Sequence, residues 1–221
     1  MSFEIFNGNY NGAIFDLDGT LINSMWVWEN ILSDFIDKSG LCADPDLVNQ
    51  VSYMNLTQSS QYVCALFPEL NMTSQEIRQT WIDTALYHYE NSIKLKDGAF
   101  DFLRKLKENG VKIAIGTSCP KELATACMKS NGIYDMIDFF AFTEEMGTNK
   151  GDPDFFITVL EKIGSSPQKA MLFEDIKIAL KTAESIGLKT VIIEDESSAP
   201  DKEYLIKNAY RYIGDFKELL V

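Results

Sequence analysis

Hydrophobic and polar positions follow two patterns along the chain and divide it into two regions. From residue 94 onward, short apolar runs alternate with segments whose apolar residues recur every three or four positions, which predicts alternating strands and helices. Such alternation is typical of an α/β fold, in which a doubly wound parallel sheet is covered by helices on both faces. Strands are expected at residues 11–15, 111–115, 139–142, 170–173, 190–193 and 210–213.

The helices of this region are bounded by glycine and proline. The first is expected between Gly98 and Gly110, with Phe100, Phe102, Leu103 and Leu106 on its inward face. Residues 195–201 are expected to form only a polar loop. Further helices are predicted at residues 120–129, 155–163 and 177–186 and after Pro200.

Residues 22–93 contain helical patterns and no convincing strand. Ser24 is a candidate cap for a helix that ends at Gly40, and the pair Asp44-Pro45 is typical of a second helix start. A third helix is expected at residues 57–67, and a fourth begins with the capping-box sequence Thr73-Ser74-Gln75-Glu76 and ends near residue 91. The sequence therefore predicts a core made of residues 1–21 and 94–221, with an all-helical insertion at residues 22–93.

The segment Ile14-Phe15-Asp16-Leu17-Asp18-Gly19-Thr20-Leu21 joins these two regions. Asp16 and Asp18 follow a predicted strand directly, and Gly19 permits the turn that must come next. The carboxyl ends of parallel strands are the edge where ligands bind, and a carboxylate there can act as nucleophile, metal ligand or proton carrier. A solvated acidic turn is the alternative. Because the insertion starts at this edge, we expect it to stand over the pocket as a cap.

Three more predicted strand ends carry polar groups. Thr117 follows Gly116 and suits a phosphoryl oxygen, Lys150 opens a helix and could neutralise a phosphate, and Glu174 and Asp175 end a strand together. An ordinary helix cap at Thr117 and a solvated surface lysine at Lys150 remain alternatives. Carboxylates gathered at one edge repel one another unless a cation lies among them, and magnesium is the natural oxygen-bound ion.

Composition narrows the classes of partner. The net charge of −13 disfavours nucleic acid and anionic membrane surfaces as partners. Four scattered cysteines and the single His88 disfavour a zinc site. The chain has no apolar stretch long enough to span a membrane and no targeting segment at its start, so a reduced, cytoplasmic setting is expected.

Together these segments resemble the haloacid dehalogenase superfamily, in particular its members with a helical cap after the first strand, such as the β-phosphoglucomutase-like phosphatases. The resemblance spans nearly the whole chain and implies a Rossmann-like core with a helical cap. It rests on residues 15–21, Thr117, Lys150 with Pro153, Asp154 and Phe156 behind it, and Phe173-Glu174-Asp175.

The resemblance implies a role for each matching residue. Asp16 would be the nucleophile that forms an aspartyl-phosphate, and Asp18 the general acid and base. Mg²⁺ would be held by Asp16, the backbone carbonyl of Asp18, Asp175 and Glu174. Phosphate would be bound by Thr117, Ser118 and Lys150. The expected function is hydrolysis of a small organic phosphate monoester by a monomer or weak dimer.

Two other functions remain open. One is a sugar-phosphate mutase, although Trp28 stands near the place where such mutases carry a cap histidine. The other is a non-catalytic binding or regulatory module, which would not need both aspartates. Ile176, Ala179 and Gly151 depart from the usual family pattern. Trp26 and Trp28 are candidate substrate contacts in the cap, followed by Tyr53 and Met54.

Overall fold

A six-stranded parallel sheet forms the centre of the molecule in the computed structural model, which describes residues 3–41, 47–52, 54 and 56–220. The strand order is β3-β2-β1-β4-β5-β6, so the first strand lies in the middle of the sheet. All six predicted strands are confirmed, with ends shifted by at most two residues. Their bounds are β1 Gly12–Phe15, β2 Lys112–Thr117, β3 Phe139–Phe142, β4 Ala170–Glu174, β5 Lys189–Ile193 and β6 Arg211–Ile213.

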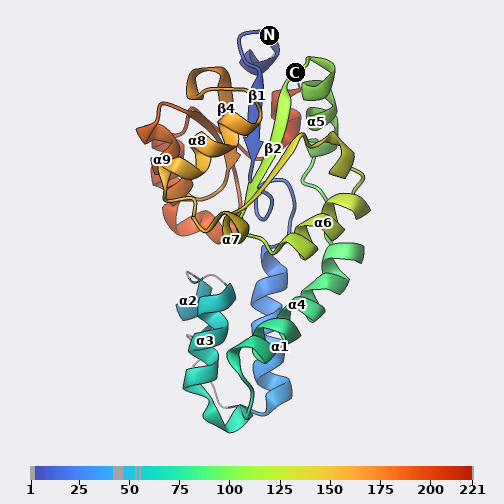
Figure 1. Cartoon of the computed structure of the whole chain (residues 1–221), viewed down its shortest axis with the longest axis vertical. Helices are drawn as coiled ribbons and strands as arrows, with labels where there is room; N and C mark the ends of the chain where they lie inside the picture. The colour runs from blue at the N-terminus through green and yellow to red at the C-terminus, as the bar shows by residue number, and fades with distance from the viewer. Residues whose placement is uncertain (1–2, 42–46, 53, 55, 221) are drawn as a thin grey trace.

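Both faces of this sheet are buried because successive strand residues point to opposite sides. On β1, Ala13 and Phe15 belong to one apolar cluster and Ile14 belongs to another. The first cluster is covered by α5 and α6 and the second by α8 and α9 (Figure 1). The doubly wound α/β fold predicted from the sequence is therefore confirmed. The helices of this region are α5 Ala99–Glu108, α6 Lys121–Ser130, α7 Thr143–Met146, α8 Pro153–Lys162, α9 Lys177–Ser185 and α10 Lys202–Asn208.

The helices of residues 22–93 gather at one end of the sheet, below the carboxyl ends of its strands (Figure 1). They are α1 Met25–Ser39, α2 Leu47–Ser52, α3 Leu56–Leu66 and α4 Ser74–Asn91. α4 begins with the predicted capping box, in which the Thr73 hydroxyl accepts a hydrogen bond from the Glu76 N–H. The predicted start at Asp44-Pro45 lies outside the described residues. The division into core and cap domains stays a prediction.

Short 3-10 segments complete the chain, and one of them replaces a predicted loop. Asp195, which we expected in a plain polar loop, accepts a hydrogen bond from the Ser197 N–H at the start of a 3-10 helix and pairs with Lys96 at 2.9 Å. The 3-10 segments are Glu4–Phe6, Pro68–Leu70, Tyr134–Met136, Pro167–Lys169, Glu196–Asp201 and Phe216–Leu219.

The prediction for Phe100 is wrong. Its side chain is 41% exposed, whereas Phe102, Leu103 and Leu106 are fully buried. Positions 99, 102, 103 and 106 share one face of α5, and a residue two positions from Phe102 lies well away from that face. No helix among the described residues is long and apolar enough to cross a membrane.

Candidate active site

The loop after β1 carries the first two acids. The Asp16 N–H donates to the Phe173 carbonyl at 2.9 Å, so pairing with β4 continues one residue beyond the strand. The Leu17 carbonyl then accepts the N–H groups of Thr20, Leu21 and Ile22, which closes a tight turn. At the tip Gly19 has φ of +79°, and a Cβ on it would lie 2.6 Å from Asp175 Oδ2. Glycine is required there by both backbone angle and space.

Three of the predicted acids meet at the boundary between β1 and β4. Carboxylate oxygens of Asp16, Glu174 and Asp175 lie within 4.8 Å of one another, and all three residues are buried. This is the position where a doubly wound sheet places its ligands, beside its central strand. Among the described residues, it is the only group of three or more His, Cys, Asp or Glu side chains gathered closely enough to hold a metal ion.

Lys150 supplies the positive charge of this cluster. Its ammonium pairs with Asp16 and with Glu174 Oε1, the latter at 2.5 Å, and its side chain is 6% exposed. Burial alone would lower the Lys150 pKa, but the two carboxylates raise it above its usual value. The lysine is therefore a fixed cation next to Asp16, rather than the solvated surface residue that the sequence left open.

One cation does not balance three buried carboxylates. Burial raises the pKa of Glu174 to about 7 despite Lys150, and burial followed by the charges of Glu174 and Asp16 raises the pKa of Asp175 well above its usual range. A divalent cation with oxygen ligands would relieve this excess negative charge. The donor set therefore fits a hard ion such as Mg²⁺.

Asp175 and Glu174 are held by neighbours that the sequence did not indicate. Thr20 Oγ1 donates to Asp175 Oδ1 at 2.8 Å, and Ser198 Oγ lies 3.5 Å from Asp175 Oδ2. Glu174 Oε2 accepts the N–H groups of Asp175 and Ile176, at 3.0 and 3.2 Å. Since Ile176 supports Glu174 through its backbone, its departure from the family pattern leaves this contact intact.

The other two departures are Ala179 and Gly151. Ala179 is fully buried in the apolar cluster under α8 and α9. Gly151 follows Lys150, and its N–H donates to Asn149 Oδ1 at 2.8 Å.

Asp18 lies in a separate environment formed by the first and last helices of the insertion. Its Oδ1 accepts hydrogen bonds from Ser24 Oγ and from the Tyr89 hydroxyl, each at 2.5 Å. Tyr89 is fully buried on α4, and its oxygen accepts a bond from Trp28 Nε1 at 3.1 Å. Burial raises the Asp18 pKa above its usual value, and the bonds from Ser24 and Tyr89 act against that rise.

Two of these contacts were missed from the sequence. Ser24 stands at the N-cap position of α1 as predicted, but its hydroxyl makes no capping bond and donates to Asp18 instead. Tyr89 is 71 residues from Asp18 in the chain, and its own segment carries no sign of a functional role.

The predicted phosphate-binding residues end β2, the neighbour of β1. Ile115 pairs with Phe15, so Thr117 follows at the same edge of the sheet as Asp16. Thr117 is buried, and its Oγ1 accepts the Cys119 N–H at 3.0 Å. Ser118 Oγ lies 3.3 Å from Thr143 Oγ1.

The candidate substrate contacts in the cap lie in different environments. Trp28 is half-buried and reaches Asp18 through Tyr89. Trp26 is 36% exposed, and its ring packs edge-on against His88 with centroids 5.2 Å apart. Met54 is half-buried against the core, and Tyr53 lies outside the described residues.

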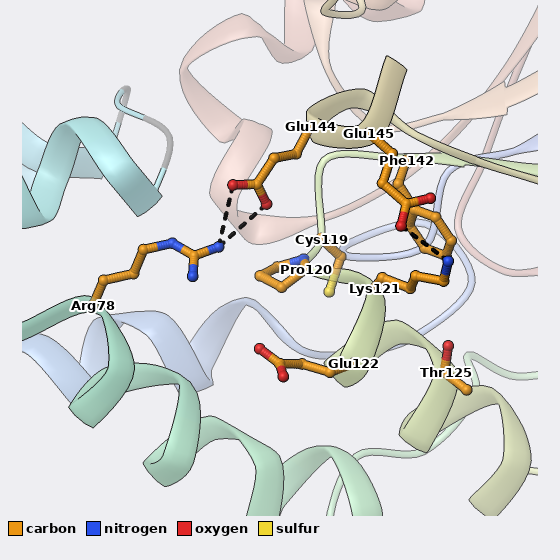
Figure 2. Close-up of a pocket in the computed structure, with 9 residues that line it drawn as sticks. All are labelled: Arg78, Cys119, Pro120, Lys121, Glu122, Thr125, Phe142, Glu144 and Glu145. Atoms are coloured by element: carbon orange, nitrogen blue, oxygen red, sulfur yellow. Dashed lines mark hydrogen bonds and ion pairs between the residues drawn. The ribbon is translucent and has the colours of Figure 1, made fainter. Parts of the chain in front are cut away.

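A pocket of about 560 Å³ lies between α4, α6 and α7 (Figure 2). Cys119 lines this pocket, and its N–H donates to Thr117 Oγ1 at 3.0 Å. Burial raises the pKa of the Cys119 thiol well above its usual value. The pocket therefore adjoins the β2–α6 loop, which also carries Thr117 and Ser118.

The fold and these acids place the chain in a known family. The haloacid dehalogenase-like hydrolase family matches residues 13–193, so the chain belongs to that family and is a hydrolase. The chain is similar to a validoxylamine A 7'-phosphate phosphatase of Streptomyces hygroscopicus subsp. limoneus, with 22% identity over 90% of this chain and 94% of that protein. A phosphorylated carbohydrates phosphatase of Thermotoga maritima is 21% identical over 81% of this chain and 82% of its own length.

The fold is also found among solved structures. CbbY from Rhodobacter sphaeroides, in complex with phosphate, has a TM-score of 0.79 and 17% identity and covers 95% of this chain and 96% of its own. At that identity the likeness concerns the fold alone.

Proposed function

We propose that the chain is a magnesium-dependent phosphatase that hydrolyses a small organic phosphate monoester through an aspartyl-phosphate intermediate. One observation carries the proposal: Asp16 lies in a buried cluster with Glu174, Asp175 and Lys150, while Asp18 two residues away lies in its own hydrogen-bonded setting. The names of the two phosphatase relatives support it.

Asp16 acts as the nucleophile. Its carboxylate attacks phosphorus, and the bond between phosphorus and the leaving oxygen breaks. Lys150 balances the negative charge that approaches Asp16, and Thr117 Oγ1 with the Ser118 N–H binds the remaining phosphate oxygens. When Mg²⁺ is bound by Asp16, Glu174, Asp175 and the Asp18 carbonyl, it supplies charge that screens the carboxylate from the phosphate dianion.

Asp18 moves the protons. Because burial raises its pKa, Asp18 keeps a protonated fraction at higher pH than an exposed aspartate. It gives that proton to the leaving oxygen. As a carboxylate it then takes a proton from the water that attacks the aspartyl-phosphate, which releases inorganic phosphate and restores Asp16. A need for both aspartates distinguishes this function from a simple binding module.

The test is phosphate release from sugar, polyol and nucleotide phosphates, with Mg²⁺ and with chelator. We expect release that requires the metal and falls to background in Asp16→Asn, while circular dichroism shows the variant folded. Equal release by Asp16→Asn would contradict the proposed nucleophile. Conversion of β-glucose 1-phosphate into glucose 6-phosphate without net phosphate release would indicate the mutase instead.

A further inference from the structure

The pocket beside the predicted phosphate-binding loop has a charge pattern that bears on the substrate. Resting on the proposed function, we propose that it receives the leaving group and selects a neutral or cationic polyhydroxyl skeleton over one with a second phosphate or a carboxylate. The alcohol oxygen protonated by Asp18 must leave on the Asp18 side of the phosphate. Cys119 lines the pocket, and its N–H donates to Thr117 Oγ1 in the predicted phosphate-binding loop at 3.0 Å, so the rest of the leaving group extends into this space.

The two cations of the lining are already paired (Figure 2). The Arg78 guanidinium contacts both oxygens of Glu144, at 3.2 and 3.4 Å, and Lys121 pairs with Glu145 at 2.9 Å. Glu122 is a third carboxylate of the lining, and no cation in the described part of the chain pairs with it. Two positive and three negative side chains give the described lining a net negative charge.

The helix end at the pocket does not reverse this balance. α6 begins at Lys121, and a helix N-terminus ordinarily attracts anions. Glu122 lies in that first turn and supplies the negative charge itself. An additional phosphate or carboxylate would therefore meet like charge, or would have to separate Arg78 or Lys121 from its partner.

The pocket offers more favourable hydrogen-bond partners to hydroxyl groups than to an additional anion. Among the described residues Arg78 contacts Glu144 through Nη2 alone, so its Nη1 can donate to a hydroxyl oxygen. The free carboxylate of Glu122 can accept from a hydroxyl or an ammonium group, and Pro120 and Phe142 offer apolar walls for carbon-bound hydrogens. A volume of about 560 Å³ is sufficient for a sugar or polyol skeleton.

A matched series of open-chain six-carbon phosphates tests the inference. The compounds 1-amino-1-deoxyglucitol 6-phosphate, glucitol 6-phosphate and 6-phosphogluconate differ at C1, which carries an ammonium, a hydroxyl or a carboxylate group. We expect kcat/KM for 6-phosphogluconate to be about tenfold below that of the other two, the order expected for one like charge near a protein surface. Equal or faster hydrolysis of 6-phosphogluconate overturns the inference.

Two variants connect the preference to this pocket. Glu122→Gln removes the unpaired carboxylate and Glu144→Gln frees Arg78, so each is expected to reduce the discrimination against 6-phosphogluconate about threefold or more. Glu161→Gln changes the net charge equally on an exposed position of α8 and is expected to leave the ratio unchanged. A ratio that neither pocket variant alters, or that Glu161→Gln alters equally, overturns the inference.

A binding measurement can test the charge preference independently of the proposed hydrolysis. If none of the three compounds releases phosphate, hydrolysis is contradicted for them, and calorimetric titration of the Asp16→Asn chain with Mg²⁺ still orders their affinities. Weaker binding of 6-phosphogluconate supports the charge preference without hydrolysis. Equal or tighter binding of 6-phosphogluconate, or binding of none of them, overturns it.

Discussion

Among single residues, Asp16 and Asp18 have different hydrogen-bond and ion-pair partners although they are only two positions apart. Asp16 forms an ion pair with the buried ammonium of Lys150. Asp18 receives hydroxyl groups from Ser24 and Tyr89 and has its pKa raised by burial. Two carboxylates with different environments can serve as nucleophile and as acid, which is the division that the proposed reaction needs.

The contact from Tyr89 predicts an effect on pH dependence. Its hydrogen bond lowers the Asp18 pKa, so Tyr89→Phe is expected to raise that pKa and move the alkaline limb of the kcat/KM profile to higher pH. We also expect kcat to fall about tenfold, less than a complete loss of general-acid catalysis, because Asp18 is oriented less well. Tyr87→Phe, on the exposed side of the same helix, is the control. An unshifted limb in Tyr89→Phe would contradict the role of this bond.

At the scale of elements, the turn after β1 brings the acids together. β1 and β4 are neighbours, so their carboxyl ends deliver Asp16 and the pair Glu174-Asp175 to one place. The turn must then pass close to Asp175, and only the lack of a side chain at Gly19 allows it.

Alanine substitutions at two glycines with similar backbone angles can distinguish backbone strain from a steric clash of the added Cβ. Gly19 and Gly40 both have positive φ, but a Cβ meets Asp175 at Gly19 and nothing within 4 Å at Gly40. Gly40→Ala should cost about 1 kcal/mol of unfolding free energy from backbone strain alone. Gly19→Ala should cost more than that and also weaken Mg²⁺ binding, because Asp175 must move. Unfolding in urea and titration with Mg²⁺ measure both effects; similar results for the two variants would contradict the crowding at Gly19.

At the scale of the whole molecule, long-range ion pairs link elements that are distant in sequence. Arg78 on α4 pairs with Glu144 on α7, and Asp138 before β3 contacts Lys107 at the end of α5 and Lys112 at the start of β2. Each of these pairs requires an ionised carboxylate, so its contribution to stability is lost when that carboxylate is protonated at low pH.

The lowered pKa of Asp138 predicts that the folded state loses stability at low pH. Burial raises its pKa, but hydrogen bonds from Lys107, the Ile113 N–H and Lys112 outweigh burial and lower it from 3.8 to about 2. The folded state binds this proton less readily than the unfolded state, so the stabilisation is complete above pH 3.8 and is lost as the pH falls towards about 2.

Asp138→Asn tests this sign directly. It is expected to lower the unfolding free energy by about 1–2 kcal/mol at pH 7, and the difference from the native chain should shrink below pH 4. Asp101→Asn removes the partner of Arg104 in an exposed pair and should change stability by less than about 0.5 kcal/mol. Denaturant unfolding at several pH values measures both; a difference at Asp138 that stays constant with pH would contradict the linkage.

The doubly wound parallel sheet and the cluster of acids could be predicted from the amino-acid sequence. Continuous apolar runs identify buried strands, and the carboxyl ends of parallel strands share one edge, so Asp16, Thr117, Glu174 and Asp175 could be placed together without a structure. The capping box at Thr73 was equally clear because its bonds lie within four residues.

The surroundings of Asp18 and of the pocket could not be predicted in this way, because they are formed by segments far apart in the chain. Tyr89 reaches Asp18, and Arg78 reaches Glu144, because of how α4 packs against the rest of the chain. Local periodicity identifies the apolar face of a helix but not the segment against which that face packs. The acids of this site could be predicted because each stands at the carboxyl end of a strand that is visible in the sequence. The contacts that shift the pKa of Asp18, and those that line the pocket, depend on packing between segments far apart in sequence.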